Sequence, residues 1–208
     1  FAVDAASERS YPGSGTTSTD LAGTNTISLD NGVGFNSTNG GTFVFDGTND
    51  EINTNLTTQY TDFSCVVIFK NNNTTAWGRL VDKSYSNGFF ISAYFLTGGL
   101  GYVGAGVIEP SSPHGQSLQY DTSVYNYFVV TRSGTTHTIY LNGSGTSASK
   151  TGSGSAMSTN AMAIGSWTGG TTSQRFTGEI PVVKTYNRAL TAAEVDQDFN
   201  AYRNRFGI

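Results

Sequence analysis

The two tryptophans of the chain stand in short polar stretches, a placement typical of side chains that bind sugars. Trp77 and Trp167 each lie beside glycine and threonine residues, and Tyr85 and Asn87 follow Trp77 closely. An exposed aromatic ring stacks on the face of a sugar, while amide groups hydrogen-bond its hydroxyls. We therefore predict a glycan-binding site that contains Trp77, Tyr85, Asn87 and Trp167. The alternative interpretation is that both indoles close the ends of the core or pack on a neighbouring subunit.

A second group of polar side chains lies in a predicted turn. Asp46, Asn49 and Asp50 fall within residues 46–50. Oxygen ligands in a tight turn are what Ca²⁺ favours, so these three residues are a candidate calcium site. The alternative interpretation is that Asp46 and Asn49 only cap the turn through hydrogen bonds to its backbone. The sequence requires no cofactor in either case.

The remaining titratable residues do not form a catalytic pattern. Glycoside hydrolysis needs two carboxylates that flank the scissile bond, but Asp50 and Glu51 are adjacent and would point to opposite faces of a strand. His114 and His137 lack the spacing of a metalloenzyme site, and we expect His137 to point outward from a strand. The sequence also lacks a Gly-x-Ser-x-Gly elbow, a phosphate-binding loop and a dinucleotide fingerprint. We therefore predict no catalytic residues and no enzymatic activity.

Charge and composition argue against two classes of partner. The chain of 208 residues has a net charge of −4, a pI of about 5.0 and no basic stripe, so we expect no nucleic-acid partner. It has no apolar run long enough for a membrane span, so we expect no membrane insertion. The single Cys65 rules out an internal disulfide. Charged residues are scarce, and the Thr, Ser, Asn and Gly that replace them are typical of extracellular and virion β proteins.

Alternating apolar residues predict the strands that must position these groups. The strongest strand runs from Phe63 to Lys70, and both of its faces are apolar, so we expect it to be central and covered on two sides. Residues 42–56 read as a hairpin whose connection is residues 46–50. We interpret residues 1–41, 109–124 and 143–160 as mainly loops.

The C-terminal stretch predicts a strand followed by a helix. Pro181 cannot donate to a strand ladder, so this strand is bulged or lies at an edge there. Thr191 with Glu194 forms a capping-box pattern, and Val195 begins an apolar helical face. About a dozen short strands and one late helix predict an all-β fold: an antiparallel β-sandwich (jelly roll) with one short C-terminal α-helix. We expect residues 1–208 to form a single domain, with residues 1–41 packed on the sandwich.

Several motifs, taken in order, resemble one family. Residues 45–50, Phe-Asp-Gly-Thr-Asn-Asp, look like the turn of LamG-like, concanavalin A-like lectin/glucanase domains. Residues 127–143 look like the hairpin of these domains, which ends in Asn-Gly. Residues 164–165, 176–178 and 186–194 match the closing pattern of the family. The resemblance implies a jelly-roll sandwich, and some relatives bind Ca²⁺ near its rim.

The N-terminus bears a narrower resemblance to LamG-like domains in structural proteins of tailed phages. The similar segments are residues 3–6, 10–17 and 20–23. The sequence departs from the pattern where Ser18 and Tyr127 replace tryptophans and where Pro181 and Val182 replace an acidic pair. The last change removes carboxylates that could have held a metal.

The resemblance implies a non-catalytic virion structural or adhesion domain, such as a decoration, fibre or tail protein. Its expected partners are other virion or surface protein subunits, in a homo-oligomer or larger assembly, and a host cell-surface glycan. The alternative is a carbohydrate-binding lectin module of a bacterial surface protein. A third alternative is a glycan-cleaving enzyme with an unfamiliar acid pair. The expected location is the virion or, for the lectin alternative, the cell surface.

Overall fold

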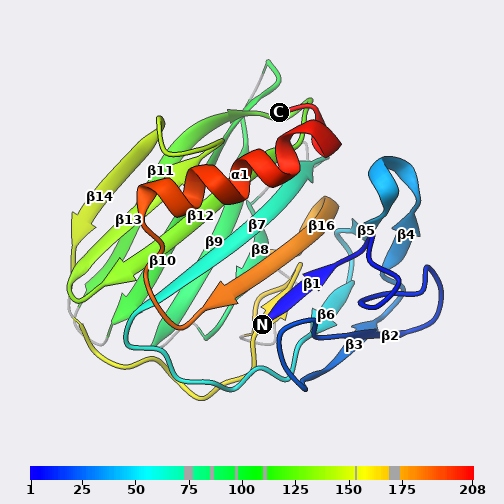
Figure 1. The fold of residues 1–208 in the computed structure, drawn as a ribbon, viewed down its shortest axis with the longest axis horizontal. Coiled ribbons are helices and arrows are strands. Elements are labelled where there is room, and N and C mark those ends of the chain that lie inside the picture. The colour runs from blue at the N-terminus through cyan, green and yellow to red at the C-terminus, as the bar shows by residue number, and fades with distance from the viewer. Residues whose placement is uncertain (73–76, 85–86, 97, 110–111, 153, 169–173) are drawn as a thin grey trace.

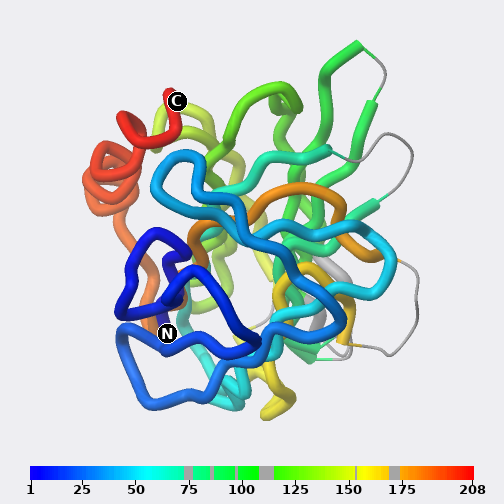
Figure 2. Tube along the Cα trace, turned by 90° about the vertical axis from the view of Figure 1, so that its right-hand side faces the viewer, coloured from blue at the N-terminus to red at the C-terminus, as the bar shows by residue number. Residues whose placement is uncertain are grey.

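The computed structural model describes residues 1–208 apart from 73–76, 85–86, 97, 110–111, 153 and 169–173, and apart from the side chains of 108–109 and 112–114. Two antiparallel sheets face each other, and one helix lies across the outer face of the first sheet (Figure 1). The side view places this helix outside the strands at one flank of the molecule (Figure 2). The predicted all-β sandwich with a C-terminal helix is confirmed.

The strands of the two sheets interleave along the chain. The first sheet contains, in spatial order, β14 (Ser147–Thr151), β13 (Thr136–Leu141), β12 (Asn126–Ser133), β7 (Phe63–Asn71), β16 (Thr177–Tyr186), β5 (Thr42–Asp46) and β4 (Gly34–Asn36), with β1 (Ala2–Asp4) paired to β16. The second sheet contains β11 (Ser112–Asp121), β10 (Leu100–Glu109), β9 (Gly88–Phe95), β8 (Trp77–Asp82), β15 (Ala163–Ile164), β6 (Glu51–Asn53), β3 (Thr26–Asp30) and β2 (Thr17–Thr19). A 3₁₀ turn, η1 (Thr38–Gly40), and the helix α1 (Ala192–Phe206) complete the elements.

Strand β7 is buried on both faces, as its sequence predicts. One face, which includes Phe63 and Val67, belongs to the core between the sheets, where the Phe63 and Phe89 rings stack with centroids 4.6 Å apart. The other face, with Val66 and Ile68, belongs to a second apolar cluster beneath α1. Val66 and Ile68 would face water without the helix, so the first sheet needs α1 as a cover.

Helix α1 begins and docks as the sequence predicts. The Thr191 side chain accepts from Glu194 N, and the Glu194 side chain accepts from Thr191 N, so the capping box is complete. Val195, on the inner face of the helix, is fully buried against the first sheet. Tyr127 Oη donates to Asp198 Oδ2 at 3.0 Å, and burial, followed by the nearby Asp198 charge, raises the pKa of Tyr127. Among the described residues, no helix is long and apolar enough to cross a membrane.

Pro181 sits at a bulge in a central strand. Strand β16 lies between β5 and β7, and its register with β7 shifts between Glu179 and Val182. The Pro181 carbonyl accepts from Ala5 N at 2.9 Å, which joins the first strand to the bulge. The bulge therefore accommodates a residue that lacks a donor in the interior of a sheet.

The prediction of a hairpin at residues 42–56 is wrong. Strand β5 belongs to the first sheet and β6 to the second, so residues 46–50 cross from one sheet to the other. Phe43 and Ile52 still point into the same core. Alternation reports which face of a strand is buried but not which strand it pairs with, and this is why the pattern misled.

The segments interpreted as loops contain strands. Residues 1–41 contain β1 to β4, residues 143–160 contain β14, and most of residues 109–124 forms β11, paired with β10 along its length. Ile27 and Leu29 alternate into the core from β3, which is a strand signal that the polar composition conceals. The position predicted for His137 is also wrong. This residue is 2% exposed, and its carbonyl accepts from Gln116 Nε2 of β11, which covers that part of β13.

Lys83 is a fully buried cation that fixes two long loops. Its Nζ donates to the carbonyls of Leu56 and Asn160, both at 2.9 Å, and the residue is 0% exposed. Burial lowers the pKa of this amine to about 8. The charged form is disfavoured in the folded state, because two carbonyl dipoles replace only part of its hydration.

We expect stability to rise with pH because of Lys83. Its folded pKa lies below that of the unfolded chain, so the unfolded state binds more protons between the two values, and the free energy of unfolding should increase by about 1–2 kcal/mol from about pH 7 to about pH 9.5. Urea unfolding at a series of pH values would measure this. The variant Lys83→Met should lose the rise, whereas Lys150→Met, at an exposed position, should keep it. An identical pH slope in all three proteins would contradict the assignment.

Candidate functional site

A row of aromatic side chains crosses the outward face of the second sheet. Trp77 of β8 pairs with Tyr94 of β9, which pairs with Tyr102 of β10. The Trp77 and Tyr94 rings lie with centroids 4.8 Å apart. Trp77 is 53% exposed and Tyr102 is 40% exposed, so the row is open to solvent. The residues that alternate with this row, such as Ala93 and Val103, belong to the core.

The next rows form the floor and the opposite wall of a groove. Ser92 lies between Arg79 and Gly104 in register, and Phe90 lies between Asp82 and Gly106. A Cβ atom on Gly106 would lie 2.3 Å from the Phe90 ring, so glycine allows this ring to lie against β10. The sheet surface is therefore low between the Trp77 row and Phe90.

Two hollows lie along this channel. One of about 340 Å³ and one of about 230 Å³ are both lined by Trp77, Phe90 and Ser92. Gln174 closes the first hollow, while Gly104 and Ser117 continue the second toward β11. We call this continuous feature the Trp77 groove.

The charged groups beside the Trp77 groove are paired. Arg79 Nη1 donates to Ser92 Oγ at 2.8 Å, and the guanidinium lies 3.7 Å from the centre of the Phe90 ring. Arg79 Nε lies 3.5 Å from Asp82 Oδ2, and both side chains are almost fully buried. Burial raises the pKa of Asp82, and the Thr168 hydrogen bond and the Arg79 charge oppose that rise. The pair leaves this side of the groove without net charge.

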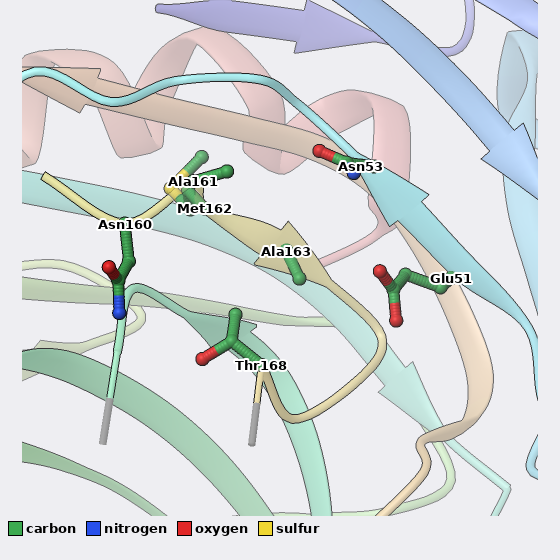
Figure 3. A pocket seen from close by; sticks show the side chains of 7 residues that line it. All are labelled: Glu51, Asn53, Asn160, Ala161, Met162, Ala163 and Thr168. Carbon is green, nitrogen blue, oxygen red and sulfur yellow. The ribbon is translucent and has the colours of Figure 1, made fainter. Parts of the chain in front are cut away.

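A polar pocket of about 290 Å³ opens on the same sheet face (Figure 3). It lies where the two-residue strand β15 separates β6 from β8. Its lining combines polar side chains with short apolar ones: Glu51, Asn53, Asn160, Ala161, Met162, Ala163 and Thr168. We call it the Glu51 pocket. Glu51 Oε2 accepts from Arg175 Nη1 at 3.0 Å and from Ser166 Oγ at 2.6 Å, which fixes the carboxylate.

The structure separates the predicted sugar-binding residues. Trp77 lies in the groove, but Asn87 lies at the turn that joins β8 to β9, at the opposite end of β8 from Trp77. Trp167 is half-buried in the segment after β15. In the described part of the chain, it lines neither the Trp77 groove nor the Glu51 pocket. Tyr85 lies outside the described residues. Tyr94 and Tyr102 were not among the predicted site residues, although each stands at an outward position of an alternating strand.

The Asp46 and Asp50 carboxylates of the candidate calcium site have partners in the turn itself, whereas Asn49 contributes its backbone carbonyl. Asp46 Oδ1 accepts from Thr48 N at 2.7 Å, and Asp50 Oδ2 accepts from Asp46 N at 2.8 Å. The Asn49 carbonyl accepts from Asn31 Nδ2 at 3.2 Å. The described residues contain no group of three or more His, Cys, Asp or Glu side chains that could hold a metal ion. These bonds are those of a capped turn, and calcium binding stays a prediction.

A family model supplies an independent finding. Residues 46–196 match the model of the concanavalin A-like lectin/glucanases superfamily. The chain belongs to this superfamily. The matched region begins at the turn that crosses between the sheets and ends in the first turn of α1, so it spans both sheets, the groove and the pocket. A comparison with curated proteins gives no match.

Several solved structures have a fold similar to that of this chain at low sequence identity. One is botulinum neurotoxin type C, whose cell entry depends on interaction with two ganglioside molecules. It has a TM-score of 0.68 and 14% identity over 89% of this chain and 48% of the neurotoxin chain. Domain 4 of an extracellular arabinanase from Geobacillus stearothermophilus, in complex with arabinotriose, has a TM-score of 0.59 and 17% identity over 84% and 87%. The CBM40 of a Ruminococcus gnavus sialidase, bound to α2,3-sialyllactose, has a TM-score of 0.53 and 15% identity over 66% and 82%. This chain spans about half the length of the neurotoxin chains that it matches. These neighbours are mainly binding domains.

We expect the Arg79–Asp82 pair to be strongly coupled in stability. Arg79→Met leaves a buried carboxylate without its cation and should lower the free energy of unfolding by about 3 kcal/mol. The double variant with Asp82→Asn should lose less than the two single losses combined, by at least about 1 kcal/mol, in denaturant unfolding.

The matched control for this cycle is Arg188→Met. Arg188 binds both oxygens of Glu194, but that pair is exposed, so its loss should cost much less than the loss of Arg79. Additive effects of Arg79→Met and Asp82→Asn would show that the two side chains do not act as a pair.

Proposed function

We propose that this protein is a non-catalytic glycan-binding module that holds an oligosaccharide in the Trp77 groove. The observation that carries the proposal is the solvent-exposed row of Trp77, Tyr94 and Tyr102 above a low floor of backbone and serine. Aromatic faces beside hydroxyl groups suit a sugar ring, whose C–H faces are apolar and whose edges carry hydroxyls.

The geometry of the groove favours a short chain of neutral sugars. Adjacent strands lie about 4.8 Å apart, so the three rings from β8 to β10 span about 10 Å across the sheet, which suits two to three sugar units. Ser92 and Ser117 offer hydroxyls along this path. Because Asp82 neutralises Arg79, the described lining of the groove offers no unpaired cation to an acidic sugar.

The state of the nearby carboxylates supports a binding role without catalysis. Asp82 is fully buried and ion-paired to Arg79, and Glu51 is ion-paired to Arg175. A glycosidase needs one accessible carboxylic acid and one accessible carboxylate on either side of the bond. Asp82 does not reach solvent, so it does not suit the role of proton donor to a bound glycan.

The biological setting follows from the N-terminal resemblance. We propose display on a virion, as a decoration, fibre or tail domain that contacts other subunits in a homo-oligomer or larger assembly. A lectin module of a bacterial surface protein is the second candidate, favoured by the similarity to glycan-bound domains such as that of the extracellular arabinanase. Both settings use the same groove for a host or environmental glycan.

The test is a glycan array probed with the wild type, Trp77→Ala, Tyr102→Ala and Trp167→Ala, each with and without calcium. We expect a neutral oligosaccharide to bind, and Trp77→Ala and Tyr102→Ala each to weaken it by about tenfold or more because stacking surface is lost. Trp167→Ala should bind like the wild type, since this residue lies outside the groove.

Three results would count against the proposal. These are an array without binding under either condition, binding that depends on Trp167 but not on Trp77, and release of reducing ends from a bound polysaccharide. A calcium requirement that Asp50→Asn removes would place the ion in the turn at residues 46–50.

A further inference from the structure

The Glu51 pocket is separate from the Trp77 groove. The Glu51 pocket and the Trp77 groove have no lining residue in common among those described. Asp82 of β8, Ala163 of β15 and Asn53 of β6 lie side by side in register, so the pocket opens on the same outward face, two strands beyond the groove. Its lining contains no aromatic ring among the described residues, so we expect hydrogen bonds to hold what it binds.

The polar atoms around the pocket are mostly acceptors. Ser166 and Arg175 both donate to Oε2 of Glu51, which leaves Oε1 as an acceptor. Asn160 uses Nδ2 to donate to Ser84 Oγ at 3.0 Å, so its Oδ1 remains an acceptor. Thr168 Oγ1 donates its hydrogen to Asp82 Oδ1 and keeps its lone pairs. Figure 3 shows these side chains around the opening.

Asn53 supplies the opposite function. Its Oδ1 accepts from Asn55 N at 3.0 Å, which leaves Nδ2 as a donor. The pocket therefore presents three acceptors from Glu51, Asn160 and Thr168, a donor group from Asn53, and the second hydrogen of Asn160 Nδ2 as a further donor. A ligand that satisfies this set must carry several hydrogen-bond donors and at least one acceptor.

The pocket is held in place before any ligand arrives. Lys83 Nζ donates to the Asn160 carbonyl, and the Thr54 hydroxyl donates to the Met162 carbonyl at 2.7 Å, so the segment that lines one side is fixed. Arg175 and Ser166 fix the Glu51 carboxylate on the other side. Side chains that need not reorganise lose less conformational entropy when they bind.

We propose that the Glu51 pocket is a second binding site, which takes a single neutral, hydroxyl-rich ring such as a terminal monosaccharide. Its volume of about 290 Å³ is at the lower limit of ligand pockets, which suits one ring better than a chain. Hydroxyls act as donors to the three acceptors, and each can also accept from Asn53. Arg175 already neutralises Glu51, so a cation gains little there. The methyl groups of Ala161 and Ala163 suit the C–H face of the ring.

The proposal is tested by titrating the isotope-labelled protein with D-glucose, D-galactose, D-mannose and L-arabinose and following backbone amide signals by NMR. At least one sugar should shift the amides of residues 51–53 and 160–168, with a dissociation constant in the millimolar range. Glu51→Gln and Asn53→Ala should each weaken this binding about tenfold, because the first removes the charge that strengthens a hydrogen bond and the second removes a donor.

Two further variants separate this site from the groove. Glu8→Gln, at an exposed position, is the matched control for Glu51→Gln and should bind like the wild type. Trp77→Ala should also leave the monosaccharide shifts unchanged. Asn53→Ala leaves the Glu51–Arg175 pair intact, so it still decides the question if Glu51→Gln disturbs the fold, which the same spectra report.

The inference is wrong if none of the four sugars shifts the amides of residues 51–53 and 160–168, or if the shifts persist in both pocket variants. It is also wrong if methylammonium binds there in preference to the sugars, because the pocket would then be a cation site. Loss of monosaccharide binding in Trp77→Ala would show one joint site instead of two. None of these results affects the test of the groove, which uses oligosaccharides and the aromatic variants.

Discussion

The structure depends on the burial of β7 on both of its faces. Phe63 and Val67 need the second sheet, while Val66 and Ile68 need α1. Burying each of these side chains contributes about 1.5–3 kcal/mol, so neither cover can be removed without a large loss. Since the helix occupies the outer face of the first sheet, the second sheet keeps an outer face that no helix of the described residues covers. The groove and the pocket both lie on that face.

The chemistry of that face follows from how the second sheet is built. Core residues such as Ile91 and Val103 occupy the inward positions, which leaves the alternate positions outside the core between the sheets. Aromatic rings stand along one row, and Ser92 and Gly104 stand on the next, so the surface has a wall and a low floor. The part of the groove toward β11 comes from side-chain size on a regular sheet, while Gln174, in the segment before β16, closes the other part. The residues that shape it are therefore held as rigidly as the sandwich itself.

Local signals in the sequence were sufficient wherever one element determines its own structure. The two-sided strand at Phe63, the bulge at Pro181 and the capping box at Thr191 are all present as predicted. Pairing between strands was not predictable in this way. Strand β11 is polar because it is defined by its backbone pairing with β10 and not by apolar burial. Strands β5 and β6 would show the same apolar alternation whether they paired with each other or belonged to different sheets. For the same reason, the sequence identified Trp77 as a candidate but not Tyr94 and Tyr102, because a row across strands exists only once the register is known.

A single buried carboxylate lies between the Trp77 groove and the Glu51 pocket and contacts a side chain of each. Asp82 Oδ2 lies beside Arg79 of the groove, and Asp82 Oδ1 accepts from Thr168 of the pocket. Each oxygen thus orients a side chain that lines a different hollow, and a carboxylate shielded from water interacts more strongly with both than an exposed one would. The cost of burying Asp82 is offset by these two contacts and by Ser84 N at 3.1 Å. The charge is buried where the two surfaces meet, and its removal would take one partner from Arg79 and one from Thr168 at the same time.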